Sequence, residues 1–193
     1  MSDIEEISQL VLWERQARGR GLDDELANCY WEDGTVTTSW SKGNARETFI
    51  GQRPVDYATT LPLVGRYAAP IVHLNGNRAY AELPSTTKHW VELDGNIAIV
   101  ESFMRLIYCV EKRNGEWKIS DMSAINEADT IAPEIPGVDL HIDVKLAKSL
   151  RISYRYLAYT RIKAGGKIGQ DGIGSDKPET VKPVYDRANA WIK

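Results

Sequence analysis

Cysteine, histidine and long apolar runs are scarce in this sequence. Its 193 residues include two cysteines and three histidines. Cys29 and Cys109 lack the paired spacing of a metal site, so we interpret both as buried free thiols. No apolar run approaches the roughly 18 residues that a membrane-spanning helix needs, and the N-terminus is acidic where a secretory signal would be basic. These absences predict a soluble, cytoplasmic protein that holds no metal.

Basic residues are neither in excess nor gathered in one stretch. The formal net charge is -3 and the isoelectric point is near 5.7. Binding to nucleic acid or to an anionic membrane surface would require lysine and arginine clustered on one face. The chain is 42% apolar and 26% charged, which at this length is typical of one globular domain with a full core. We therefore expect neither nucleic acid nor a membrane as a partner.

Helical patterns open the chain. Ser2 and Glu5 form a capping-box pattern, followed by apolar residues at helical spacing, and predict a helix that runs to about Arg18. A second short helix, a strand and a weaker third helix are expected over residues 23–30, 35–40 and 43–52.

Three two-residue turn signals follow, and they are the most specific feature of the sequence. Asn75-Gly76, Asp94-Gly95 and Asn114-Gly115 supply the positive φ angles of type I′ turns and are flanked by long β-rich segments. They predict a four-stranded antiparallel meander with long strands. A bulge is expected near Pro84, because proline cannot donate to an interior ladder.

Extending the register outward from these turns assigns side chains to the two faces of the sheet. One face receives Ala98, Val100, Ser102, Met104, Leu106, Tyr108, Val110, Ile119, Ser123 and Ile125. The other receives Tyr67, Ile71, His73, Tyr80, Glu82, Trp90, Ile99, Glu101, Phe103, Arg105, Ile107, Met122, Ala124 and Asn126. Both faces are too apolar to meet water, so we expect helices on one and a second subunit on the other, giving a homodimer that pairs through the sheet.

The composition changes after residue 132. Residues 143–163 have helical spacing, and a final helix is expected over 178–191, with Asp176 and Glu179 as its capping box. The glycine-rich segment between them lacks the Lys-Ser or Lys-Thr ending of a phosphate-binding P-loop. We divide the chain into a domain over residues 1–132 and a C-terminal helical extension, residues 133–193, packed on the same domain.

The order of two helices, the segment YWEDGTVTTSW and a meander that ends in RLIYCVEKRNGEWKISDMSAI resembles the SnoaL-like branch of the nuclear transport factor 2 superfamily. This resemblance implies a cone-shaped α+β fold (NTF2-like, cystatin-like) in which N-terminal helices pack on a strongly curved antiparallel sheet around a hydrophobic pocket. It also implies a homodimer. The fold hosts enzymes and non-enzymes alike, so it does not settle the activity.

The acid/base pair implied by the resemblance is missing. Enzymes of this fold commonly use an Asp near the end of the first helix and a His early in the second long strand, and these positions fall on Gly19 and on Gly65 or Arg66. The remaining candidates are Glu101 as a base in an apolar pocket and Arg105 as the group that holds an anionic or carbonyl oxygen. A structural ion pair between Glu101 and Arg105 is the alternative.

Aromatic and polar residues could line a cavity for a flat apolar ligand, or could instead form a packed core and a dimer interface. The candidates are Tyr30, Trp40, Tyr67, Glu82, Trp90, Phe103 and Asn126. Two hypotheses follow. The first is a cofactor-independent proton-transfer enzyme, of dehydratase, isomerase or cyclase type, that acts on a small hydrophobic carbonyl or hydroxyl compound. The second is a non-catalytic ligand-binding or interaction protein on the same fold.

Overall fold

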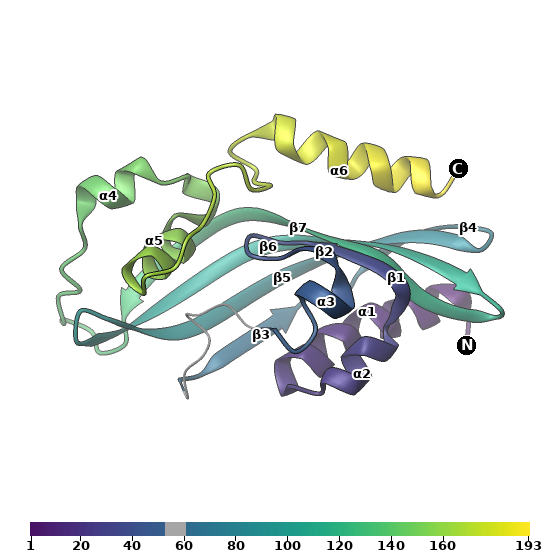
Figure 1. Ribbon diagram of the computed structural model, residues 1–193, viewed down its shortest axis with the longest axis horizontal. Coiled ribbons are helices and arrows are strands. Elements are labelled where there is room, and N and C mark those ends of the chain that lie inside the picture. The colour runs from purple at the N-terminus through teal and green to yellow at the C-terminus, as the bar shows by residue number, and fades with distance from the viewer. Residues whose placement is uncertain (53–60) are drawn as a thin grey trace.

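The computed structural model describes residues 1–52 and 61–193 and consists of one long sheet with helices on both faces (Figure 1). The N-terminal part contains α1 (Asp3–Arg20), α2 (Asp23–Asn28), β1 (Tyr30–Thr37), β2 (Lys42–Asn44) and α3 (Ala45–Thr48). The capping box predicted for α1 is formed, because the Ser2 side chain accepts from the Glu5 amide and the Glu5 carboxylate accepts from Ser2.

The predicted meander is confirmed. Its strands are β4 (Ile71–Asn75), β5 (Arg78–Leu93), β6 (Asn96–Arg113) and β7 (Glu116–Pro133), and β3 (Leu63–Tyr67) also pairs with β5. The sheet order is β2-β1-β7-β6-β5-β3, with β4 beside β5. Since β1 pairs with β7 in parallel, the sheet is mixed rather than purely antiparallel.

The bulge expected near Pro84 does not occur. Pairing between β5 and β6 keeps one register from Arg78 opposite Glu111 to Leu93 opposite Asn96. The other edge of β5 is covered by two separate strands, β3 and β4, and the Ala68 amide in the break between them donates to the Pro84 carbonyl at 3.1 Å. The missing amide of Pro84 is thus accommodated by an interruption of the neighbouring strand.

Two register shifts lie instead on β7, where Ser120 and Glu127 are extra residues relative to β6. Each shift moves the side chains beyond it to the opposite face. Met122 therefore pairs with Tyr108, and Asn126 pairs with Met104. Our assignment of Met122, Ala124 and Asn126 to the face of Glu101 was wrong, because a register extended from a turn contains no bulge.

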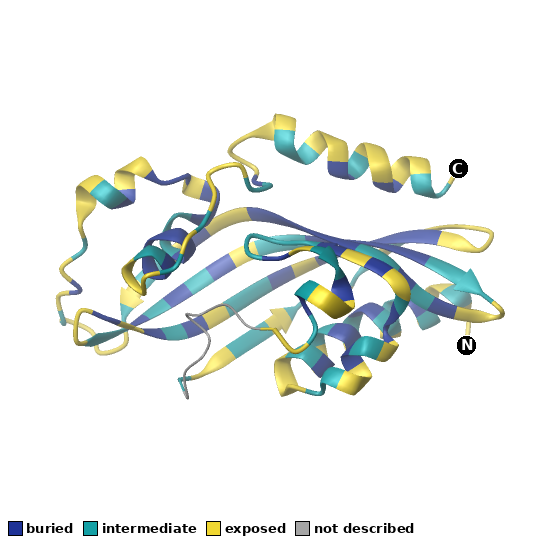
Figure 2. Cartoon of the chain, viewed as in Figure 1, coloured by how far each residue is buried: buried dark blue, intermediate teal, exposed yellow. Residues whose placement is uncertain are grey.

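The two faces of the sheet have different covers. The inner face, which carries Leu83, Met104 and Leu106, packs against α1 and α2, and further along the strands against α5 (Arg155–Lys163). The outer face, which carries Tyr80, Ile107 and Ile125, packs against α6 (Pro178–Trp191). In Figure 1, α1 and α2 lie below the strands and α6 lies above them, and Figure 2 shows buried and exposed positions alternating along β5 and β6.

The helix predicted over residues 143–163 is divided. It consists of α4 (Val144–Ser149), a 3₁₀ turn (Ile152–Tyr154) and α5, with Leu150 and Arg151 extended between them. The buried Arg151 guanidinium binds the Asp176 carboxylate at 2.6 and 3.1 Å and also donates to the Gly172 carbonyl. This contact explains why the predicted Asp176 cap of α6 does not form: Lys177 occupies the cap position without a side-chain bond.

Part of the outer face stays uncovered. α6 packs over Tyr80, Ile107 and Ile125, while Phe103 remains 37% exposed and Trp90 and Ile99 are partly exposed. None of the helices in the described part of the chain is long and apolar enough to cross a membrane.

Candidate active site

A cavity of about 120 Å³ lies between α1, the segment Thr38–Trp40 and the inner face of the sheet. The walls are mostly apolar and come from α1, the segment Thr38–Trp40, Phe49 after α3, and from β3, β5–β7 and α5. They include Trp40, Phe49, Leu63, Met104, Leu106, Met122, Ala124 and Leu157. A concave, largely apolar cavity with a few polar groups is the usual form of a small-molecule site.

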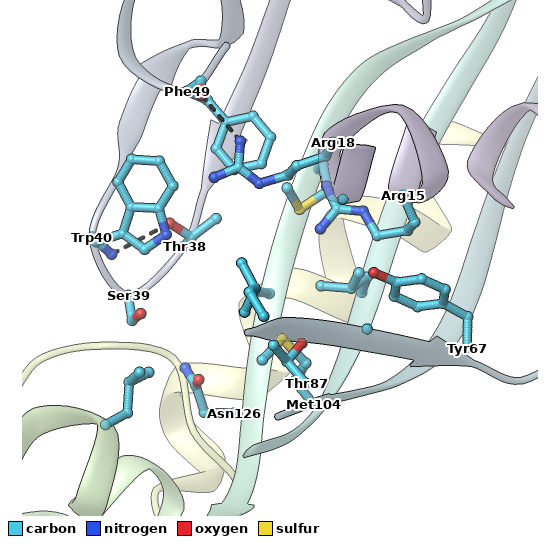
Figure 3. A pocket seen from close by; sticks show the side chains of 17 residues that line it. Arg15, Arg18, Thr38, Ser39, Trp40, Phe49, Tyr67, Thr87, Met104 and Asn126 are labelled. Atoms are coloured by element: carbon cyan, nitrogen blue, oxygen red, sulfur yellow. Dashed lines mark hydrogen bonds between the residues drawn. The ribbon is translucent and has the colours of Figure 1, made fainter. Parts of the chain in front are cut away.

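Two guanidinium groups enter this cavity from α1 (Figure 3). Arg15 and Arg18 are three residues apart and so point to the same side of the helix. The Arg18 guanidinium lies 3.8 Å from the centre of the Phe49 ring and donates to the Phe49 carbonyl at 3.2 Å. The Trp40 ring stacks with Phe49 at 5.5 Å and its centre lies 5.2 Å from the Arg18 guanidinium, so the cation contacts both rings at this end of the cavity.

Arg15 is fixed from behind by a buried carboxylate. Glu14 is fully buried and accepts from the hydroxyls of Tyr30 and Tyr108 at 3.0 and 2.9 Å. The Nε and Nη2 atoms of Arg15 donate to the two Glu14 oxygens. Burial, and then the Glu14 charge, raise the pKa of Tyr30 well above its usual value, so this phenol stays protonated and remains a hydrogen-bond donor.

Tyr67 supplies the one phenol among the described lining residues. Burial raises the pKa of Tyr67 above its usual value, which keeps the hydroxyl protonated at neutral pH. A Cβ atom at Gly65 would lie 2.0 Å from the Tyr67 hydroxyl oxygen, so this oxygen fills the space that a side chain at position 65 would need. A Cβ atom at Gly19, which also lines the cavity, would meet open space.

Three of the residues predicted to bind ligand do line the cavity: Trp40, Tyr67 and Asn126. Asn126 also ties the glycine-rich segment to β7, because its Nδ2 donates to the Ile173 carbonyl at 2.9 Å. Tyr30 lies beneath the cavity, as a donor to Glu14.

The predicted catalytic pair lies on the outer face, away from the cavity. Glu101 pairs with Lys88 at 3.3 Å and Arg105 with Glu127 at 2.9 Å, so the alternative ion pair between Glu101 and Arg105 is not formed either. Arg105 also donates to the Tyr185 hydroxyl at 2.5 Å.

The other predicted ligand residues share that face. Tyr185 donates to Glu82 at 2.8 Å, so Glu82 anchors α6 to the sheet together with Arg105. Trp90 pairs with Ile99, and Phe103 pairs with Thr86, in the part of the outer face beyond α6. Glu82, Trp90 and Phe103 were predicted to line the cavity because Tyr67 and Asn126 were assigned to the same face of the sheet as these residues. Tyr67 and Asn126 in fact belong to the inner face.

Sequence reasoning missed the two arginines, although a signal for them exists. Ile7 and Val11 start an apolar stripe on α1. Glu14 and Arg15 follow Val11 by three and four residues, and Arg18 follows Glu14 by four, so all three continue the stripe. Charged residues on a buried stripe are rare unless they are paired, and they indicate a functional or structural network.

In the described part of the chain, the cysteine and acidic side chains give no evidence of a second catalytic site or of a metal site. Burial raises the pKa of Cys29 and of Cys109 to about 12, so neither is a nucleophile at neutral pH. Within residues 1–52 and 61–193, no three His, Cys, Asp or Glu side chains group closely enough to hold a metal ion.

Comparison with known proteins agrees with this fold. Residues 1–123 match the model of the SnoaL-like domain family. The chain is 26% identical over 183 residues to Pea pathogenicity protein 2 of Fusarium vanettenii, covering 86% of this chain and 78% of the relative.

Two solved structures share the fold. A putative scytalone dehydratase from Novosphingobium aromaticivorans superposes with a TM-score of 0.52 at 15% identity, covering 66% of this chain and 86% of that one. A hexachlorocyclohexane dehydrochlorinase, LinA-type3 from Novosphingobium barchaimii, superposes with a TM-score of 0.51 at 12% identity, covering 69% and 90%. With N-terminal helices on a curved sheet and a match over most of its length, the chain belongs to the SnoaL-like family, on the NTF2-like α+β fold.

Proposed function

We propose that the protein is a cofactor-independent enzyme of dehydratase, isomerase or cyclase type that transfers a proton on a small, mostly apolar carbonyl or hydroxyl compound. The observation that carries this proposal is the apolar cavity with two guanidinium groups at one end and a protonated phenol in its wall. The names of two structural neighbours, a putative scytalone dehydratase and a hexachlorocyclohexane dehydrochlorinase, support an elimination reaction.

The arginines suit a reaction that develops negative charge on oxygen. Removing a proton from the carbon beside a carbonyl moves charge onto the carbonyl oxygen. A guanidinium that is already fixed in place can stabilise this charge without reorganising, and one such donor is typically worth about 10²–10³ in rate. Arg15 is fixed in this way by Glu14.

Tyr67 can carry the proton in an elimination. In one concerted step, its oxygen accepts the proton from the carbon beside the carbonyl while the phenolic proton passes to the leaving hydroxyl of the substrate. The C–O bond breaks, the double bond forms, water departs and the phenol is restored. Figure 3 shows the Tyr67 side chain in the cavity wall, with its hydroxyl below Arg15 on the same side of the cavity.

A non-catalytic binding protein is the second candidate. It is favoured by the lining itself, since the cavity-lining residues in the described ranges include neither a carboxylate nor an imidazole. These are the side chains that most often act as bases at neutral pH.

A proton-exchange experiment separates the two candidates. The protein is incubated in D₂O with a panel of cyclic β-hydroxy carbonyl compounds, and NMR follows loss of water and deuterium uptake beside the carbonyl. The enzyme hypothesis expects protein-dependent exchange or elimination, lowered about 10²–10⁴-fold in Tyr67→Phe, the range of general acid/base catalysis. Arg20→Gln, an exposed residue of α1 outside the cavity, is the control. Saturable binding with no exchange on any compound would support the binding protein instead.

A further inference from the structure

We propose that Gly65 is a positioning residue of this site: the missing side chain at position 65 allows the Tyr67 hydroxyl to lie in the cavity wall below Arg15. This inference deepens the proposed function by naming the residue that sets the place of the proton-carrying phenol. Its catalytic part rests on the proposed function, whereas the contact between Gly65 and Tyr67 is testable without turnover.

Three alternate residues of β3 face the cavity. Leu63, Gly65 and Tyr67 all line it, as expected of residues two apart on one strand. A side chain at position 65 would therefore project into the cavity. The Tyr67 hydroxyl oxygen lies 2.0 Å, and the Tyr67 Cζ atom 2.6 Å, from the place of the Cβ atom that Gly65 lacks. Real Cβ atoms do not approach other atoms within 3.0 Å, so the phenol occupies the place of the absent side chain.

The backbone does not explain a glycine at this position. Glycine within a strand weakens it, and often marks a bulge or a close approach of other atoms. The pairing of β3 with β5 runs without a shift from Leu63 opposite His89 to Tyr67 opposite Ser85, so the ladder over these residues contains no bulge. The φ angle of Gly65 is not positive, so any other residue could adopt this conformation. The close approach of the Tyr67 phenol is the explanation that remains.

The place that the phenol occupies is buried and lies among charged groups. Burial raises the pKa of Tyr67, and the Arg15 charge, the strongest of the charges that act on it, lowers this pKa. Of the other charges, Glu14 raises the pKa of Tyr67, and Arg18 and Arg66 lower it. Arg15 is itself fixed by Glu14, so the distance between its guanidinium and the phenol depends on how far the Tyr67 ring leans over position 65.

A side chain at position 65 would displace the hydroxyl. The oxygen would have to retreat from 2.0 Å to at least 3.4 Å from the new Cβ atom, where ordinary van der Waals contact begins. In the concerted elimination, the Tyr67 oxygen must reach both the proton on carbon and the leaving hydroxyl, within about 2.6–3.2 Å. A misplacement of about 1 Å in a catalytic group can lower the rate about 10²-fold. Gly65 therefore affects the chemical step through the position of Tyr67.

NMR of protein labelled with ¹³C-tyrosine tests the geometry without substrate. The Tyr67 signal is the one lost in Tyr67→Phe. In wild type, a nuclear Overhauser effect is expected between the Tyr67 ring and the Gly65 α protons, because the Tyr67 Cε2 atom lies 3.3 Å from the Cβ position of Gly65. In Gly65→Ala the phenol should ionise at lower pH, nearer to about 10, because burial, the largest influence on its pKa, is reduced.

Gly19→Ala is the matched control for this measurement. Gly19 also lines the cavity and has no positive φ, but its added Cβ atom would meet open space, so the Tyr67 ionisation should stay as in wild type. Absence of the Overhauser effect in wild type, or an unchanged Tyr67 ionisation in Gly65→Ala, would overturn the proposal. The Overhauser effect is measured in wild type and therefore covers the case in which Gly65→Ala fails to fold.

Steady-state kinetics test the catalytic part on a β-hydroxy carbonyl compound that the wild type turns over. Gly65→Ala should lower kcat at least about tenfold and change KM less than about threefold, whereas Arg20→Gln should change neither. In the Tyr67→Phe background, Gly65→Ala should lower kcat by less than about twofold more, because Gly65 acts only through the phenol. A higher KM with an unchanged kcat, or losses that add in the double variant, would refute the positioning role.

The two measurements separate this inference from the proposed function. If the wild type turns over no compound of the panel, the enzyme hypothesis fails, and the Overhauser effect and the Tyr67 ionisation still decide whether Gly65 places the phenol. If the wild type and Gly65→Ala turn over a compound with equal kcat, the enzyme stands and the positioning role is refuted.

Discussion

Among single substitutions in the N-terminal half of the protein, replacing the buried Glu14 carboxylate is expected to lower the free energy of unfolding most. It has no solvent exposure and receives hydrogen bonds from Tyr30, Tyr108 and Arg15. The Arg15 side chain is 11% exposed, so it depends on Glu14 for its counter-charge. Glu14→Gln removes that charge and leaves the guanidinium facing a neutral amide.

The magnitude follows from what the substitution leaves behind. Breaking a buried ion pair on one side typically lowers the free energy of unfolding by about 3–5 kcal/mol. Removing one hydrogen bond to the carboxylate, as in Tyr108→Phe, is expected to cost about 1.5–3 kcal/mol. With a urea m-value of about 2–3 kcal/mol/M, Glu14→Gln should lower the unfolding midpoint by roughly 1–2 M.

Urea unfolding followed by circular dichroism measures these effects. Glu47→Gln, at an exposed position of α3, is the matched control and should change the free energy by less than about 0.5 kcal/mol. The double variant Glu14→Met with Arg15→Met should recover part of the loss, because it leaves no unpaired charge. A loss below about 1 kcal/mol in Glu14→Gln, against the ~3–5 kcal/mol expected for a buried pair, would refute the reasoning.

Three further predictions concern other parts of the molecule. Burial, and then the Arg161 charge, lower the pKa of His89 to about 4, so the folded state favours the neutral imidazole. The free energy of unfolding is therefore fully retained above about pH 6.5, the pKa of an unfolded histidine, and falls by up to about 3 kcal/mol as the pH is lowered towards 4. Comparing the pH dependence of unfolding in wild type and His89→Gln should show this loss in wild type alone, and parallel curves would contradict it. Arg151→Lys should weaken the attachment of the glycine-rich segment and lower the free energy of unfolding by about 3 kcal/mol, because the paired hydrogen bonds to Asp176 are lost. Proteolysis within residues 165–175 should then be faster, and resistance equal to wild type would show that the Arg151–Asp176 ion pair does not hold this segment. We also propose that a second copy of the chain covers the outer face beyond α6; Phe103→Asp should then convert a dimer to a monomer in light scattering, and a monomeric wild type would refute the dimer.

Local chemistry in the sequence was sufficient for the hairpins and the first helix. Asp94-Gly95 and Asn114-Gly115 form the predicted turns with a positive φ at both residues, because two residues decide the backbone conformation there. In the first hairpin Asn75 instead ends β4 and pairs with Arg78, so the loop shifts by one residue to Gly76 and Asn77, with a positive φ at Gly76. The capping box of α1 likewise depends on Ser2 and Glu5 alone. These features are settled within a few residues of chain.

The positions of the site residues were not predictable in this way. The face of Asn126 depends on an extra residue at Ser120, and bulges have no fixed sequence signal. The break at Arg151 depends on Asp176, which lies 25 residues further along the chain. Glu101 and Arg105 looked catalytic because the register without a bulge placed them with Tyr67 and Asn126.

The sequence by itself determined the SnoaL-like fold and the order of its elements. It also named Trp40, Tyr67 and Asn126 as candidates for a cavity wall, but it placed Tyr67 and Asn126 on the wrong face of the sheet. The tertiary structure alone decided that Arg15 and Arg18 are the charged groups of that cavity. The reason is physical: a hairpin or a cap is fixed by neighbours in the chain, whereas the direction in which a guanidinium points is fixed by a carboxylate and two phenols brought together from α1, β1 and β6.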